Sequence, residues 1–264
     1  MFTNFQFDKE FASDYGLLVC AFNNTGTETV SSGSTLTFNT KSSFGSDEFN
    51  LFGVQYDNPY TATFQLVKNP CLNSQTSTIT PDEYSQINKW LTRKNFCEFR
   101  INEIGYENIV FFGSFNIQAI KIAGMIEGIE CTFTSSAPYA YDEEVTSVLS
   151  GKDFTIYSFS DEIGEICPDV EIIINEDGDL RISNSLDDEA LVINSCTKGE
   201  VLSINPKSKI ITSSLMQHDQ QIANDFNFNY IKICNNYDNN LNHYKASLDI
   251  TMTIKYRPVR KIGI

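Results

Sequence analysis

The stretch Leu248-Asp249-Ile250-Thr251-Met252-Thr253-Ile254-Lys255-Tyr256 decides the fold, because apolar and polar residues alternate through it without a break. Alternation with a period of two is the pattern of a strand that has one buried face and one solvated face. The rest of the chain has shorter runs of the same kind, bounded by turn residues at intervals of about 8 to 12 positions. The sequence therefore predicts a mainly β protein of the sandwich or barrel type.

Two turns upstream of that strand predict hairpins. The runs Glu171–Ile174 and Leu180–Ser183 flank Asn175-Glu176-Asp177-Gly178-Asp179, where Asp-Gly favours a tight hairpin turn. Residues 201–212 contain a second pair of apolar runs, separated by Pro206-Lys207-Ser208. Both hairpins belong to the second half of the chain, for which we predict a β-sandwich.

The first half combines strands with one helix. Thr80, Pro81 and Glu83 are an N-cap, a first-turn proline and the partner of a capping box, so we predict a helix over about residues 81–94. Apolar residues fall on one face of this helix at Tyr84, Ile87, Trp90 and Leu91. The strands predicted around it are Leu51–Gln55, Thr61–Val67, Cys97–Ile101, Ile109–Ile122 with a break near Gly113, and Met125–Thr134.

A change in composition divides the chain into two predicted domains. The small-residue run Ser135-Ser136-Ala137-Pro138 is followed by the acidic Asp142-Glu143-Glu144, a combination typical of a boundary. We therefore expect domains at residues 1–140 and 141–264, each long enough to bury its own core.

The charge balance excludes several classes of partner. The 264 residues include 19 Lys and Arg against 34 Asp and Glu, a formal net charge of −15. Such a field repels phosphate backbones and anionic lipid, so neither nucleic acid nor a membrane is an expected partner. Met1–Glu10 lacks the pattern of a secretory leader, and we expect synthesis in a cytoplasm. The cationic residues Lys255, Arg257, Arg260 and Lys261 are interpreted as a solvated end rather than a docking segment.

The cysteines are spread singly, without the CxxC spacing of a zinc site. Several lie in apolar runs, as Cys20 and Cys234 do, so we interpret them as reduced residues of the core. The full set is Cys20, Cys71, Cys97, Cys131, Cys167, Cys196 and Cys234.

No catalytic, cofactor-binding or metal-binding residue is predicted. The two histidines, His218 and His243, lie in polar surroundings outside any known catalytic signature and are interpreted as exposed loop residues. The acidic segment 175–179 lacks the ligand spacing of an EF-hand, and turn chemistry explains it better than calcium. The sequence thus favours a structural protein over an enzyme, with no cofactor.

Two other functions stay open as alternatives. A carbohydrate-binding module that contacts host cell-wall sugars could use Tyr230, Tyr237 or Tyr244 of the second half to stack a sugar. A glycoside hydrolase needs only two carboxylates at a suitable separation, for which Glu171 and Asp179 are an example.

A series of short motifs follows in order along the chain: Ser13–Leu17, Trp90-Leu91, Phe96–Phe99, Gly113–Phe115, Gly128–Thr134, Ser136–Pro138, Pro168–Ile174, Lys198–Asn205, Asn224–Phe226 and Ile254–Pro258. Together these motifs resemble the distal tail proteins (Dit) of long-tailed phages and prophages of Gram-positive bacteria. Two departures are Phe44-Gly45-Ser46-Asp47-Glu48, where the family often has a Gly-Arg-Asp-Gly-like turn, and Asn240-Leu241-Asn242, where it usually has Gly-x-Asn.

This resemblance implies a β-barrel-like N-terminal domain with one helix that assembles into a hexameric ring, followed by a galectin-like β-sandwich. It implies that the last residues can return to the first domain. It also implies a hub of the tail tip or baseplate in the virion, which joins the tail tube protein to the tail-associated lysin or fibre and to receptor-binding proteins during host attachment.

Overall fold

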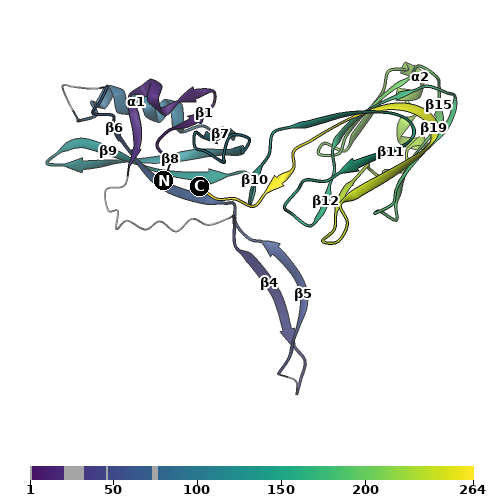
Figure 1. Cartoon of the computed structure of the whole chain (residues 1–264), viewed down its shortest axis with the longest axis horizontal. Helices are drawn as coiled ribbons and strands as arrows, with labels where there is room; N and C mark the ends of the chain where they lie inside the picture. The colour runs from purple at the N-terminus through teal and green to yellow at the C-terminus, as the bar shows by residue number, and fades with distance from the viewer. Residues whose placement is uncertain (1, 21–32, 46, 73–76) are drawn as a thin grey trace. The chain divides into compact units, whose positions relative to one another are not determined.

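The computed structural model describes residues 2–20, 33–45, 47–72 and 77–264, and divides the chain into two compact units (Figure 1). The first unit comprises Met1–Asp142 together with Arg260–Ile264, and the second comprises Glu143–Val259. Strands dominate both units, so the mainly β fold class is confirmed.

The first unit is built on a seven-stranded sheet that curls on itself. Its order is β2-β1-β7-β8-β9-β6-β3, and the amide of Val19 in β3 donates to the carbonyl of Thr3, just before β1, at 3.2 Å. Opposite ends of the sheet therefore meet, which gives the barrel-like form. Its elements are β1 (Phe5–Phe7), β2 (Glu10–Phe11), a 3-10 turn (Ala12–Tyr15), β3 (Leu17–Cys20), β6 (Thr61–Lys68), α1 (Pro81–Leu91), β7 (Cys97–Ile101), β8 (Phe111–Ile122), β9 (Met125–Ser135) and β10 (Ala140–Tyr141).

The core of this unit is aromatic, and α1 is anchored to it through Trp90. The indole is 2% exposed, stacks on Phe5 with ring centroids 5.7 Å apart, and donates through Nε1 to the carbonyl of Phe7 at 3.0 Å. The rings of Phe99, Phe115 and Phe133 complete the centre of the cluster. Burying the single tryptophan with its N–H satisfied fixes the helix on the sheet.

The helix begins where predicted and ends three residues early. The amide of Glu83 donates to Thr80 Oγ1 at 3.3 Å and the amide of Thr80 donates to Glu83 Oε2 at 2.7 Å, which confirms the capping box. At the other end, the amide of Arg93 donates to Ser114 Oγ at 3.1 Å instead of to a helix carbonyl. That contact with β8 stops α1 at Leu91.

The predicted break near Gly113 is wrong, because β8 runs through it. Gly113 pairs with Cys97 on one side and Ser135 on the other. A Cβ at this position would lie 2.4 Å from the Phe133 ring. The glycine thus leaves room for the Phe133 ring while the strand continues. In the sequence, a glycine with this packing role cannot be told from a glycine that breaks a strand.

The last five residues complete the first unit. Tyr106 Oη donates to the carbonyl of Gly263 at 2.8 Å, and the amide of Ile264 donates to Tyr60 Oη at 2.7 Å. Arg260 Nε lies 3.8 Å from Asp142 Oδ2. These contacts join the last five residues to segments that lie more than a hundred positions earlier in the sequence.

The second unit is organised by one long strand, β19 (Leu241–Tyr256), which contains the alternating stretch that predicted it. Strand β11 pairs along one edge of β19 for nearly its whole length. The other edge takes β14 near Ala246 and then β13 from Ile250 onwards. The remaining elements are β11 (Val145–Tyr157), β12 (Gly164–Ile166), β13 (Asp169–Ile174), β14 (Gly178–Asn184), β15 (Ala190–Cys196), β16 (Val201–Asn205), β17 (Ile210–Ser213), α2 (Met216–Asp219), α3 (Ile222–Asp225) and β18 (Ile233–Asn235). The short strand β20 (Val259–Arg260) contains the last residue of this unit and the first of the residues that return to the first unit.

The Asp-Gly hairpin is a wrong prediction, although both of its strands exist. Strands β13 and β14 do not pair with each other; they follow one another along the same edge of β19. Gly178 has a φ of 144°, which is outside the left-handed α region that a type I′ turn requires. The segment between them is anchored to a bulge in β19, where the amide of Asp249 donates to Glu176 Oε1 at 2.7 Å.

The other local predictions have mixed outcomes. The hairpin at residues 201–212 is confirmed, since Asn205 pairs with Ile210. All seven cysteines are free, but Cys71 and Cys167 are exposed, so the assignment of all seven to the core is wrong. His243 lies in β19 and not in a loop.

Candidate functional site

The most conspicuous surface of the first unit is a two-stranded hairpin of β4 (Leu36–Ser42) and β5 (Phe49–Tyr56). Within the described part of the chain, these two strands pair only with each other (Figure 1). Residues directly opposite in an antiparallel pair share a face, so the register assigns each side chain to one of two faces.

The paired residues of the two faces differ in polarity. Leu36 pairs with Tyr56 and Phe38 pairs with Val54; beyond a bulge, Thr40 and Ser42 pair with Leu51 and Phe49. The paired residues of the opposite face are polar or glycine: Thr37, Asn39, Lys41, Asn50, Gly53 and Gln55. The exposed Phe52 lies in the bulge, outside the paired register. We call the first side the hairpin face and define it by its six apolar residues Leu36, Phe38, Phe49, Leu51, Val54 and Tyr56.

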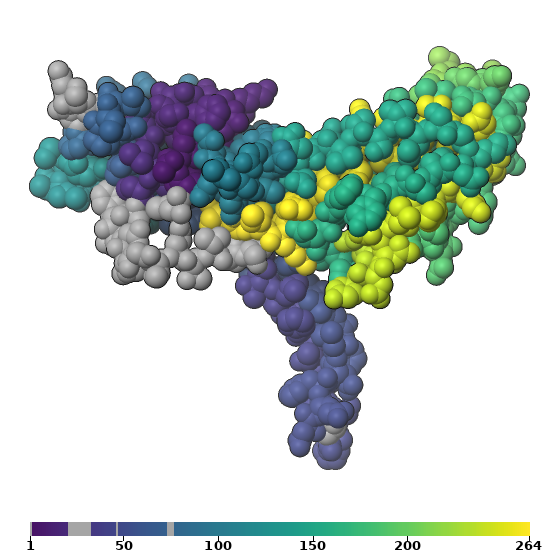
Figure 2. All heavy atoms as spheres, in the orientation of Figure 1, coloured from purple at the N-terminus to yellow at the C-terminus, as the bar shows by residue number. Residues whose placement is uncertain are grey.

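The hairpin face is open to solvent. Phe38 is 59% exposed, Phe49 71% and Leu51 57%, and Figure 2 shows the hairpin at the surface of the molecule. Contiguous exposed apolar surface is uncommon in proteins that stay monomeric. A two-stranded ribbon without a third strand is also only marginally stable in water. The hairpin face thus has the properties of a docking surface.

The base of the hairpin is tied to the first unit. The amide of Ser34 donates to the carbonyl of Pro138 at 2.7 Å, and its hydroxyl donates to the carbonyl of Asn58 at 2.5 Å. The Tyr56 ring meets Tyr139 edge to face, with centroids 6.0 Å apart. These contacts fix the starting point of both strands.

Sequence reasoning identified half of this hairpin. Leu51–Gln55 was a predicted strand, but its partner β4 was not predicted. The signal is the alternation Leu36-Thr37-Phe38-Asn39, which is short and is followed by polar residues.

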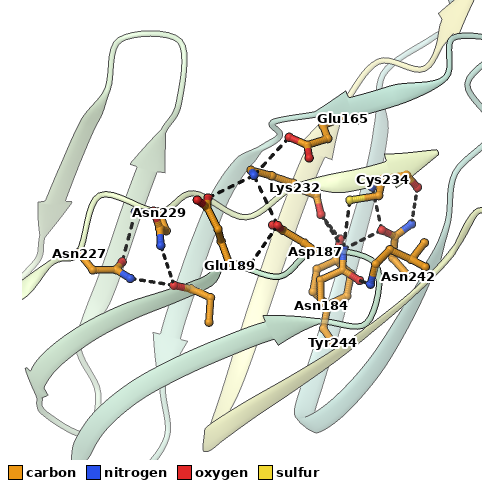
Figure 3. A network of polar contacts seen from close by, with 12 residues as sticks. Glu165, Asn184, Asp187, Glu189, Asn227, Asn229, Lys232, Cys234, Asn242 and Tyr244 are labelled. Carbon is orange, nitrogen blue, oxygen red and sulfur yellow. Dashed lines mark hydrogen bonds and ion pairs between the residues drawn. The ribbon is translucent and has the colours of Figure 1, made fainter. Parts of the chain in front are cut away.

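A network of polar contacts around Lys232 lies in the second unit (Figure 3). Lys232 Nζ lies 3.3 Å from Glu165 Oε2, 3.5 Å from Asp187 Oδ1 and 3.3 Å from Glu189 Oε2. Burial alone lowers the pKa of Lys232, but the hydrogen bonds to Glu165 and Glu189 and the charge of Asp187 outweigh it, so the pKa is raised. One ammonium therefore ties together three chain segments.

The backbone around Lys232 is held by buried side chains. Tyr244 Oη and Asn184 Nδ2 both donate to the carbonyl of Lys232, at 2.7 and 3.0 Å. Asn242 Oδ1 accepts from Asn184 Nδ2 and from the amide of Cys234, both at 2.8 Å. These polar groups satisfy one another, which is the condition for a stable buried network.

His218 has a structural environment that its sequence context did not reveal. It lies in the short helix α2 with its side chain only 9% exposed, so the interpretation as an exposed loop residue is wrong. Its Nδ1 lies 2.5 Å from Glu200 Oε1, and Ser213 Oγ donates to the same oxygen at 2.5 Å. The amide of Thr197 donates to Glu200 Oε2 at 3.0 Å. The fully buried Glu200 thus anchors α2 to the end of β17.

A shallow groove of about 340 Å³ lies on the outer surface of strands β13, β16, β17 and β19. Glu171 lines it, whereas Asp179 does not and accepts instead from the amide of Ser195 at 2.9 Å. None of the three candidate tyrosines lines it: Tyr244 is 1% exposed, Tyr230 packs against the core and Tyr237 is 89% exposed. The structure therefore does not bring the sequence-predicted sugar or acid groups together in this groove.

The described ranges contain neither a metal-binding cluster nor a helix that could span a membrane. No group of three or more His, Cys, Asp or Glu side chains there is arranged to hold a metal ion. None of the helices in the same ranges has the length and apolar character to cross a bilayer.

Comparisons with known proteins give the family. A family model described as the phage tail protein N-terminal domain matches residues 1–137. The chain belongs to this phage tail protein family. A second model, the phage tail C-terminal domain, matches residues 139–256. No curated protein matches the chain.

The fold of this phage tail protein is that of a distal tail protein. It is similar to the crystal structure of the SPP1 Dit (gp 19.1) protein, described as a paradigm of the hub adsorption apparatus in phages that infect Gram-positive bacteria. The TM-score is 0.69 at 10% identity, over 97% of this chain and 99% of that one. The resemblance to the distal tail proteins is thereby confirmed.

Proposed function

We propose that this phage tail protein is the ring-forming hub of a tail tip or baseplate. Six copies close a ring through their first units, and the ring joins the tail tube to the tail-associated lysin or fibre and to receptor-binding proteins. The protein acts as a structural component of the virion and not as an enzyme.

The observation that supports this proposal most strongly is the match of the whole chain to one hub protein. The similarity extends over both units, and family models for phage tail domains cover both halves. A match confined to one unit would fit any protein that uses a common β-sandwich, because such folds host many functions. The combination of two units in one order is more specific.

The chemistry of the second unit also supports a structural role. The charged groups of the Lys232 network and of the His218–Glu200 pair bond to one another rather than converge on an open cavity. Groups engaged in this way hold loops and strands in place, which is what a rigid scaffold for other tail proteins requires.

The experiment is to locate the protein in assembled phage particles. A short epitope inserted in the exposed β16–β17 turn, next to Lys207, lets gold-labelled antibody mark the chain in electron micrographs. We expect label at the distal end of the tail, and a mass-spectrometric ratio of six copies per particle. Label along the tail shaft or at the capsid contradicts the proposal, and particles without the epitope control for non-specific binding.

A further inference from the structure

We propose that one end of the second unit binds a basic segment of a different protein. We call this surface the aromatic end and define it by five exposed side chains, Tyr157, Phe159, Ile163, Tyr237 and Leu241. A hub must hold other proteins, and this surface is one place where it does so, so the inference rests on the proposed function. The arrangement, the exposed area and the charge of the surface support it.

The aromatic end is formed by two chain segments that lie side by side next to β12, at one end of the second unit (Figure 1). Tyr157 pairs with Leu241, so their side chains share a face. The rings of Tyr157 and Phe159 are in contact, with centroids 4.9 Å apart. Ile163 and Tyr237 belong to the same two segments. Residues distant in the sequence thus form one surface.

Hydrogen bonds fix the backbone beneath the aromatic end. Asn235 Nδ2 donates to the carbonyls of Ser160 and Glu162, at 2.8 and 2.7 Å. The amide of Ser158 donates to the carbonyl of Asn240 at 2.9 Å. These bonds tie the two segments together before any partner arrives. Binding therefore orders little backbone, which lowers its entropic cost.

The exposed area of the aromatic end fits the centre of a protein interface. Tyr157 is 47% exposed, Phe159 60% and Tyr237 89%. With about 150 to 250 Å² per aromatic side chain, these three rings present about 300 to 500 Å². The largest apolar patch of a typical monomer has a similar area and often serves a function. Tyr and Phe are also enriched at the centres of protein interfaces, within a polar rim.

The charges beside these rings favour a basic partner. The two segments contain Asp161, Glu162 and Asp238 but no Lys or Arg. A second copy of the chain would bring the same acidic groups into the contact, and an anionic cell-wall polymer would be repelled in the same way. Lys and Arg side chains of a different protein would complement this rim and steer its association.

Site-specific photo-crosslinking in phage particles tests the identity of the partner. A benzophenone amino acid replaces Tyr237 or, as the matched control, Met216, which is 77% exposed on α2. We expect position 237 to crosslink to a different virion protein at a yield at least fivefold above that of position 216. Mass spectrometry should find more Lys and Arg than Asp and Glu in the crosslinked segment.

Several results of this experiment overturn the proposal. Crosslinks from position 237 to a second copy or within one chain identify the wrong occupant. The absence of any protein crosslink is the result expected for a glycan ligand. Equal yields from the two positions, or a crosslinked segment that is acidic, are also incompatible with a basic partner at the aromatic end.

A second measurement separates the aromatic contact from the charges. Tyr237→Ser and Glu162→Lys/Asp238→Lys are compared with Glu144→Lys/Asp188→Lys, which reverses two acidic residues outside the two segments. Thermal unfolding checks that all three variants fold, and quantitative mass spectrometry of particles gives the copies of the crosslinked protein per copy of this chain. We expect the first two variants to lower this ratio at least threefold and the control to leave it unchanged. An unchanged ratio in either of the first two contradicts the proposal.

The two proposals fail in different ways. If position 237 crosslinks only within this chain or to a second copy while gold label lies at the tail tip, the docking inference is wrong and the hub proposal stands. If the gold label lies elsewhere in the particle, the hub proposal is wrong, whatever the crosslinks show.

Discussion

Asn184 and Asn242 face each other inside the second unit, with Asn184 Nδ2 2.8 Å from Asn242 Oδ1. Asn242 is fully buried, and its Nδ2 also donates to the carbonyl of Cys234 at 2.9 Å. The two amides connect β14, β18 and β19, so a single side-chain pair joins three strands that are distant in the sequence.

Replacing Asn242 by Ala leaves several buried polar groups without a partner. Each such group costs about 1 to 3 kcal/mol, so we expect Asn242→Ala to lower the free energy of unfolding by about 3 kcal/mol. Chemical denaturation measures the change. Asn236→Ala, in the adjoining loop, is the control and is expected to change stability by less than about 0.5 kcal/mol; equal effects of the two contradict the assigned network.

Trp90 is expected to be the largest single contributor to the core of the first unit. Trp90→Ala removes the stacking on Phe5 and the hydrogen bond to Phe7, at a cost of about 3 to 5 kcal/mol. The exposed Lys89→Ala on the same helix is the matched control. A loss below about 1 kcal/mol for Trp90→Ala, measured by denaturant titration, is incompatible with this packing.

Gly113 is expected to tolerate no side chain. The Cβ of Gly113→Ala would lie 2.4 Å from both the Phe133 ring and the carbonyl oxygen of Thr134. Relief of such overlap costs about 1 to 3 kcal/mol or more. Gly53→Ala, where no atom lies within 4 Å, is the control. If the two substitutions lower the melting temperature equally, β8 and β9 do not pack as described.

Glu83 is expected to give the first unit part of its stability above pH 4.5. The hydrogen bond from Lys68 is the main cause that lowers the pKa of Glu83 below its ordinary value of 4.5; burial opposes it, and the hydrogen bonds from Thr80 lower the pKa further. A carboxylate with a lowered folded-state pKa stabilises the fold above the unfolded-state pKa, and this contribution disappears as pH falls through the folded-state value.

The measurement is the melting temperature of the native chain and of Glu83→Gln as a function of pH. We expect a gap between the two above pH 4.5 that closes at lower pH. In a Lys68→Met background the gap should be smaller throughout, because the ion pair of 2.8 Å is absent. A gap that persists unchanged in strong acid contradicts this origin.

The apolar pair Ile122 and Met125 at the β8–β9 tip, 55% and 54% exposed, is expected to take part in self-association. Ile122→Ser/Met125→Ser should lower the fraction of ring at a given concentration, while Lys121→Ser, next to it, should not. Sedimentation velocity measures the two. If the double variant assembles as the native chain does, this apolar pair takes no part in self-association.

Sequence patterns correctly predicted the structural features that depend on neighbouring residues. The capping box at Thr80 and Glu83 and the hairpin at 201–212 are local, and both are confirmed. The alternation of Leu248–Tyr256 correctly indicated the strand on which the second unit is built. In each case, the physical cause acts within a few residues of its effect.

Strand pairing and side-chain burial depended on distant residues and were predicted less well. Asp177-Gly178 has the composition of a hairpin turn, but β19 provides a common edge for β13 and β14 and prevents their pairing. His218 is flanked by polar residues, yet its side chain is buried, because it contacts Glu200, which lies eighteen positions away in the sequence. The β4–β5 hairpin was only half predicted, because the apolar alternation of β4 is short and is followed by polar residues.

The most direct test of the central claim is a cryo-electron microscopy reconstruction of the tail tip of phage particles that contain this chain. We predict six copies in a closed ring at the distal end of the tail tube, with the ring formed by the first units. A chain that lies outside the tail tip, or that is present there as a single copy, would contradict the claim.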